Sequence, residues 1–130
     1  MENLHIEATE TTPKIDFNKD TGEFILEGKS VPSNADSFYR EALEWLDEYM
    51  KKPKEKTLIT LKLDYFNIAS SKKILHVLYK LNDLIEKGYS VESDWYYHED
   101  EDDMLEVGQD FAFMVKIPFA FIEYNPFEEV

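Results

Sequence analysis

Residues 58–86 constrain the fold more than any other stretch, because the spacing of their apolar residues changes partway along. In the first part every second residue is apolar, which is the spacing of a β-strand with one buried face. That face carries Ile59, Leu61, Leu63 and Tyr65. From about Ser70 to Gly88 the apolar residues lie three or four positions apart, which predicts an amphipathic helix. The sequence therefore predicts a strand at 57–66 and a helix at 70–86 that packs on a sheet.

The turn between this strand and this helix carries Asn67, Ser70 and Ser71. Their short polar side chains can accept hydrogen bonds from the free N–H groups of the first helical turn. The start of a helix also favours negative charge by roughly 0.3–1 kcal/mol. A phosphoryl group on a serine would be stabilised there, although helix capping alone also accounts for serines at this position.

Hydrophobic spacing and turn residues predict the other elements of the chain. Before residue 57 they are an edge strand at 4–8, a β-hairpin at 14–17 and 23–27, a loop at 28–33, and a helix that begins at 35 and ends at 51–53. After residue 86 they are a strand at 89–97, a short helix that the acidic run 98–103 opens and that ends near Gly108, and a final apolar run at 113–122. Pro118 interrupts this run and restricts it to an edge position, a bulge or the start of a strand. This order predicts one α/β (α+β) domain over 1–130, a mixed sheet with helices mainly on one face.

Composition limits the classes of partner. The chain has 14 basic and 28 acidic residues, a net charge of −14, which repels nucleic acid and anionic lipid and suits a basic protein partner. It has no cysteine, so disulfides and thiol chemistry are excluded. No stretch has the length of a membrane span and no leader pattern begins the sequence, so we expect a cytoplasmic protein without membrane insertion.

The motifs that hold phosphate or zinc, GxxxxGK[ST], GxGxxG and HExxH, are absent from the sequence, and no cofactor is predicted. The run Glu99–Asp103, with His98, supplies carboxylates that could bind Mg²⁺ or Ca²⁺, but its spacing is not that of an EF-hand. A metal-binding protein or enzyme that uses residues 98–103 is therefore one alternative. A constitutive interaction scaffold is another, because aromatic residues and carboxylates together are typical of a protein-binding surface.

Three segments of the sequence stand out together: IEATETTPKIDFNKDTGEFILEGKSVPSNADSFY, LDYFNIASSKKIL and WYYHEDEDDMLEVGQDFAFMVKIPFAFIEY. They resemble the SiaC family of bacterial regulatory phosphoproteins, whose fold is related to the STAS domain of anti-sigma factor antagonists. The resemblance covers nearly the whole chain, and it implies a non-enzymatic, STAS-like adaptor in a partner-switching system. Such an adaptor is phosphorylated by a Ser/Thr kinase, dephosphorylated by a PP2C-type phosphatase, and binds and activates a diguanylate cyclase, which raises cyclic di-GMP and favours biofilm.

The resemblance also implies where the switch lies, because the phosphorylated residue of the family directly follows the asparagine of the turn. In this sequence that position holds Ile68, which has no hydroxyl group, so we predict Ser70 or Ser71 as the phosphoacceptor. A dianionic phosphoryl group beside Asp64 would repel a partner that binds the turn. The predicted partner contacts are Asp64, Tyr65, Phe66, Asn67, Ile68, Glu99, Asp100 and Asp102.

Overall fold

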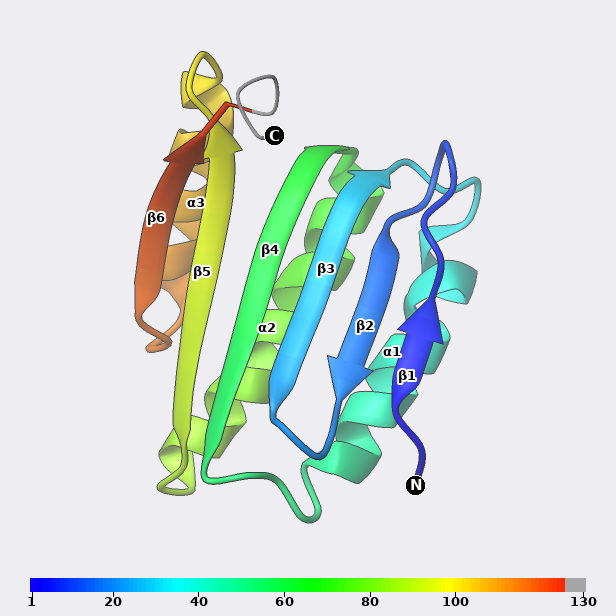
Figure 1. Cartoon of the computed structure of the whole chain (residues 1–130), viewed down its shortest axis with the longest axis vertical. Coiled ribbons are helices and arrows are strands. Elements are labelled where there is room, and N and C mark those ends of the chain that lie inside the picture. The colour runs from blue at the N-terminus through cyan, green and yellow to red at the C-terminus, as the bar shows by residue number, and fades with distance from the viewer. Residues whose placement is uncertain (126–130) are drawn as a thin grey trace.

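Six strands form one mixed sheet in the order β1-β2-β3-β4-β5-β6, and three helices lie on one of its faces (Figure 1). The structure is a computed structural model, and it describes residues 1–125. The strands are β1 (Leu4–Ile6), β2 (Lys14–Asn18), β3 (Glu23–Ser30), β4 (Lys56–Phe66), β5 (Ser90–His98) and β6 (Phe119–Tyr124), and the helices are α1 (Ala35–Tyr49), α2 (Ile68–Glu86) and α3 (Asp102–Met114). The predicted fold class and the predicted order of elements are confirmed.

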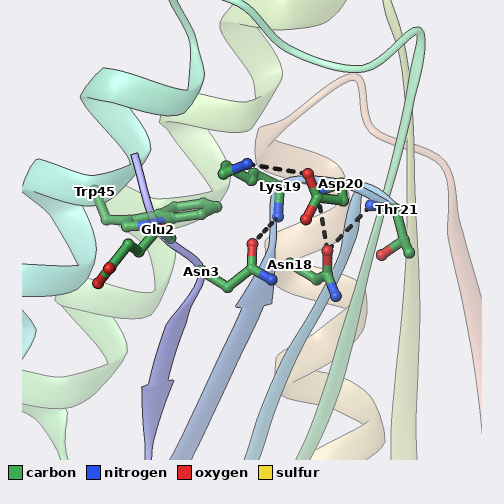
Figure 2. A network of polar contacts seen from close by, with 7 residues as sticks. All are labelled: Glu2, Asn3, Asn18, Lys19, Asp20, Thr21 and Trp45. Carbon is green, nitrogen blue, oxygen red and sulfur yellow. Dashed lines mark hydrogen bonds and ion pairs between the residues drawn. The ribbon is translucent and has the colours of Figure 1, made fainter.

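The hairpin of β2 and β3 is held by its turn and by the N-terminal residues (Figure 2). The side-chain oxygen of Asn18 accepts hydrogen bonds from the N–H groups of Asp20 (2.9 Å) and Thr21 (3.1 Å). Gly22 follows with a positive φ of 74°, and a Cβ there would collide with the carbonyl oxygen of Lys56. This close approach requires glycine and fixes the hairpin against the start of β4.

Strands β3, β4, β5 and β6 are parallel, and each successive pair is connected by one helix. The predicted β-α-β unit of 57–66, 70–86 and 89–97 is thereby confirmed. Because the strands are parallel, the turns that lead into α1, α2 and α3 all lie at the same end of the sheet (Figure 1). The predicted turn at 67–71 and the predicted acidic segment at 99–103 are therefore at the same end of the molecule.

The hydrophobic core lies between the sheet and the three helices. The sheet contributes alternate residues, among them Ile59, Leu61 and Leu63, and the helices contribute one apolar stripe each. Its largest fully buried side chains are Phe17, Phe24, Tyr39, Tyr49 and Trp95. No helix covers the opposite face of the sheet in the part of the chain that the structure describes (Figure 1).

The C-terminal third differs from the sequence prediction. Helix α3 does not end near Gly108 but continues to Met114, so that Phe113 and Met114 belong to a helix and not to a strand. The last strand begins only after Pro118. Gly108 lies in the interior of this helix and does not end it. The residue there is glycine because the ring of Trp95 leaves no room for a side chain. Other predicted limits also move. Strand β3 extends through Ser30 into the predicted loop, and α2 begins at Ile68. Strand β1 ends at Ile6 and α1 ends at Tyr49, both earlier than predicted.

Candidate functional site

A β-bulge at Asp64 shapes the surface at the end of β4. Gly28 pairs with Leu63 and Lys29 pairs with Tyr65, so Asp64 has no partner in β3. The extra residue reverses the alternation of the two faces. Tyr65 therefore points outward and is 56% exposed, whereas Phe66 packs beside Trp95 with a centroid distance of 6.4 Å. The prediction that Tyr65 shares the buried face of Ile59 was wrong.

Asn67 alone caps helix α2 through its side chain. Its backbone is extended, and its side-chain oxygen accepts a hydrogen bond from the Ser70 N–H (2.9 Å). The helix begins two residues earlier than the sequence predicted, so Ser70 and Ser71 are helical and do not cap it. Ile68 is the first residue of the helix, and its side chain is 78% exposed. The turn thus presents Tyr65 and Ile68 as two exposed apolar side chains.

The two serines of the turn lie in different environments. Ser70 is fully buried, and its Oγ accepts a hydrogen bond from Ser30 Oγ (2.8 Å), which in turn is bonded to the hydroxyl group of Tyr39 (2.6 Å). Burial raises the pKa of Tyr39 to about 12. Ser71 is half-buried, and its Oγ donates to the carbonyl oxygen of Ile68 (2.7 Å). Only Ser71 therefore has a hydroxyl group near the surface.

The hydrogen-bonded hydroxyl groups of Ser30, Tyr39 and Ser70 join β3, α1 and α2, and sequence reasoning did not identify this contact. Ser30 and Ser70 are 40 residues apart, and neither lies in a motif that could have indicated the pairing. The contact holds the starts of both helices at one place. Between these starts lies a shallow groove of approximately 590 Å³ that Ser33, Asn34, Ile68, Ala69 and Lys72 help to line.

At the edge of this groove, Lys73 Nζ of α2 forms an ion pair with Asp36 of α1 (2.6 Å). The hydrogen bond from Lys73 holds the pKa of Asp36 below its usual range. A second ion pair joins Lys80 to Asp47 farther along the same two helices. The flank of α2 that carries Lys73 and Lys80 is therefore covered by α1.

The acidic segment lies on the other side of the β4–α2 turn. Glu99, Asp100 and Asp102 are all exposed, and Asp102 is the first residue of α3. Asp64 connects this segment to β4, because its carboxylate lies 3.3 Å from Nε2 of His98 at the end of β5. The predicted contact residues thus come together at one end of the sheet, apart from Phe66, which points into the core.

Residues 1–125 contain neither a cluster of metal ligands nor a helix that could span a membrane. No group of three or more His, Asp or Glu side chains is placed to hold a metal ion. The run 99–103 therefore forms no such group within the described residues. None of the described helices combines the length and hydropathy of a membrane span.

The comparison with protein families decides the class of this chain. A model of the SiaC family of regulatory phosphoproteins matches residues 6–124. The chain belongs to the SiaC family. The resemblance of the three sequence segments is thereby confirmed.

Solved structures of SiaC from Pseudomonas aeruginosa share the fold of this SiaC-family chain. The apo-SiaC crystal structure superposes with a TM-score of 0.86 at 26% identity and covers 94% of this chain and 99% of that one. SiaC in complex with the diguanylate cyclase SiaD, described as the cyclase's activator, superposes with a TM-score of 0.88 at 25% identity, over 93% and 99%. An uncharacterized protein of P. aeruginosa (strain UCBPP-PA14) is 26% identical over 92% of this chain and 95% of its own length.

Proposed function

We propose that this chain is a non-enzymatic adaptor that binds and activates a diguanylate cyclase through the β4–α2 turn. The observation that carries the proposal is the exposure of Tyr65 (56%) and Ile68 (78%), which lie three residues apart on either side of this turn. Large apolar side chains at a turn are anchors for a protein partner. The P. aeruginosa relative with the same fold is the activator of the cyclase SiaD.

The acidic residues beside the turn support a basic partner surface. Asp64, Glu99, Asp100 and Asp102 are exposed at the same end of the sheet as the turn. Complementary charge accelerates association and selects partners. Asn67 acts by fixing the first turn of α2, and Phe66 acts from the core by holding the end of β4.

We further propose Ser71 as the residue that a Ser/Thr kinase modifies and that a PP2C-type phosphatase restores. Ser70 fits this role poorly, because its Oγ is buried and already accepts a hydrogen bond from Ser30. A phosphoryl group has no room in a close-packed interior. Ser71 needs only to exchange its hydrogen bond to Ile68 for water. A dianion at this position would oppose an apolar partner group at Ile68.

The test uses each diguanylate cyclase encoded in the genome from which the chain comes, purified and assayed singly for binding and for cyclic di-GMP production. The unmodified chain should bind one of them and raise its activity. Ile68→Ser should weaken binding by about tenfold or more. Ser71→Asp should weaken it similarly, whereas Ser37→Asp, the same change in the exposed first turn of α1, should not. If no cyclase binds the unmodified chain, the proposed function is wrong.

One observation favours a second candidate, a constitutive activator without phosphoregulation. The position after Asn67, where the family resemblance implies a hydroxyl group, holds Ile68. Mass spectrometry of the chain from its native cells, with and without phosphatase treatment, separates the two. Phosphate on Ser71 supports the switch, and its absence under every growth condition supports the constitutive form.

A further inference from the structure

One flank of α2 carries an uncovered apolar strip that begins at the turn. Ile68, Leu75 and Tyr79 lie seven and then four residues apart, a spacing that places them on one side of a helix. Ile68 is 78% exposed, Tyr79 is 45% exposed and Leu75 is half-buried. The flank that carries Lys73 and Lys80 is the one that α1 covers. The strip therefore lies on the side of α2 that faces α3.

The strip continues onto the C-terminal end of α3. The Tyr79 hydroxyl group lies 4.0 Å from the sulfur atom of Met114, to which it donates. Met114 is 54% exposed and its neighbour Phe113 is 92% exposed. From Ile68 to Tyr79 the strip measures about 16 Å, at ~1.5 Å per helical residue. Exposed apolar residues that form one continuous strip mark an interaction site.

Carboxylates border this strip along α3. Asp103 and Asp110 lie eleven and four residues before Met114, so they share the flank of α3 that contacts Tyr79. Asp102 and Glu106 project farther outward, and all four are exposed. None of the four forms an ion pair with another residue of the described chain, 1–125. Like charges four residues apart repel one another in a helix, and a basic partner would remove this repulsion.

We infer that the α2–α3 flank, defined by Ile68, Leu75, Tyr79, Phe113 and Met114 with the bordering carboxylates of α3, docks an amphipathic helix of a protein partner. The occupant carries apolar residues at helical spacing and Lys or Arg residues on the side next to α3. A second copy of this chain does not fit, because its own α3 would bring like charges together. An anionic membrane is disfavoured by the same carboxylates.

That the partner is the cyclase rests on the proposed function. The same strip also includes Ser71, the proposed site of phosphorylation. Ser71 lies three residues after Ile68 and four before Leu75, so it belongs to the same strip. A phosphoryl group on Ser71 would stand inside the docking surface. The partner helix would then have to cover a dianion with apolar side chains, which opposes binding.

The first experiment places the photocross-linking residue p-benzoylphenylalanine at position 113 of the full chain in its native cells. The control carries it at position 41, on the exposed side of α1. Position 113 should cross-link to a partner peptide that belongs to a helix with Lys or Arg along one side. Cross-links to a second copy of this chain, to lipid, or at no higher yield than position 41 overturn the inference.

The second experiment measures the affinity of the purified partner for two variants, Phe113→Ser and the double variant Asp103→Lys/Asp110→Lys. Each should bind about tenfold more weakly or worse, and the binding of the unchanged chain should weaken with added salt. The control Glu41→Lys/Glu44→Lys makes the same charge change on α1 and should bind as the unchanged chain does. Circular dichroism verifies that each variant folds, which is expected because every substituted residue is exposed.

The outcomes separate this inference from the proposed function. If a cyclase binds and Ile68→Ser weakens it while the variants of α3 bind like the control, the docking surface is wrong and the proposed function stands. If position 113 cross-links to a basic helix of a protein that is not a cyclase, and no cyclase binds the unmodified chain, the surface stands and the proposed function is wrong.

Discussion

Replacing Gly108 by alanine should destabilise the protein, although the same change in most helix interiors stabilises. Gly108 lies inside α3, where alanine is favoured over glycine by about 1 kcal/mol. A Cβ at this position, however, would lie 2.5 Å from Nε1 and 2.6 Å from Cε2 of Trp95. The two effects oppose each other, and the packing of Trp95 decides which is larger.

Trp95 has little freedom to move away from such a methyl group. It is 1% exposed, and its Nε1 donates a hydrogen bond to the carbonyl oxygen of Met104 (3.0 Å). Overpacking a core costs about 1–3 kcal/mol, and a buried donor that loses its partner costs about 1–3 kcal/mol more. After the gain in helix propensity is subtracted, we expect Gly108→Ala to lower the free energy of unfolding by roughly 1–5 kcal/mol.

Urea denaturation followed by circular dichroism measures this change. A loss of about 2 kcal/mol lowers the midpoint by about 1 M, for a slope near 2 kcal/mol/M. Gln109→Ala, at the exposed neighbouring position, should change stability by no more than about 0.5 kcal/mol. In a Trp95→Leu background the penalty of Gly108→Ala should shrink, because the ring atoms that the Cβ meets are gone. A higher midpoint for Gly108→Ala in the otherwise unchanged chain would refute the reasoning.

Two further predictions concern the turn and the hydroxyl contact beneath it. Asn67→Ala should lower the free energy of unfolding by about 1 kcal/mol in urea denaturation, because the Ser70 N–H loses its acceptor, and Asn67→Ser should restore most of it; equal stability of all three proteins would contradict the capping role. Burial raises the pKa of Tyr39 to about 12 from 10.0. The contribution of its neutral side chain to the free energy of unfolding is therefore present below pH 10 and is lost as pH rises toward 12. Unfolding measured between pH 9 and pH 12 should therefore show a loss of roughly 2–3 kcal/mol that Tyr39→Phe lacks, and parallel curves for the two proteins would contradict it.

Much of the fold could be predicted because hydrophobic spacing is a local property. The hairpin, the β-α-β unit and the helix at 35–49 each show their own apolar period, and the order of elements then leaves few sheet topologies. The helix around Gly108 was predicted too short, since glycine is a common helix terminator and only the distant Trp95 explains it here.

The positions of the strand-to-helix turn and of the acidic segment could be predicted, but the orientation of their side chains could not. The strand-to-helix turn and the acidic segment were identified from sequence, and parallel strands bring them to one end of the sheet. The bulge that turns Tyr65 outward depends on the pairing of β4 with β3. The burial of Ser70 depends on Ser30 and Tyr39, and the exposure of Phe113 depends on the length of α3. Each of these three features depends on a contact between distant residues or on where a helix ends, and the local spacing of apolar residues indicates neither.

The sequence by itself determined the elements, their order, the family and the acidic character of the surface, because periodicity, motifs and net charge are all written along the chain. Only the tertiary structure decided which of two adjacent serines has a hydroxyl group near the surface and which aromatic side chains are exposed. Burial is a relation between residues far apart in sequence. A one-residue bulge or one buried hydroxyl contact therefore changes the exposed surface and leaves the local pattern unchanged.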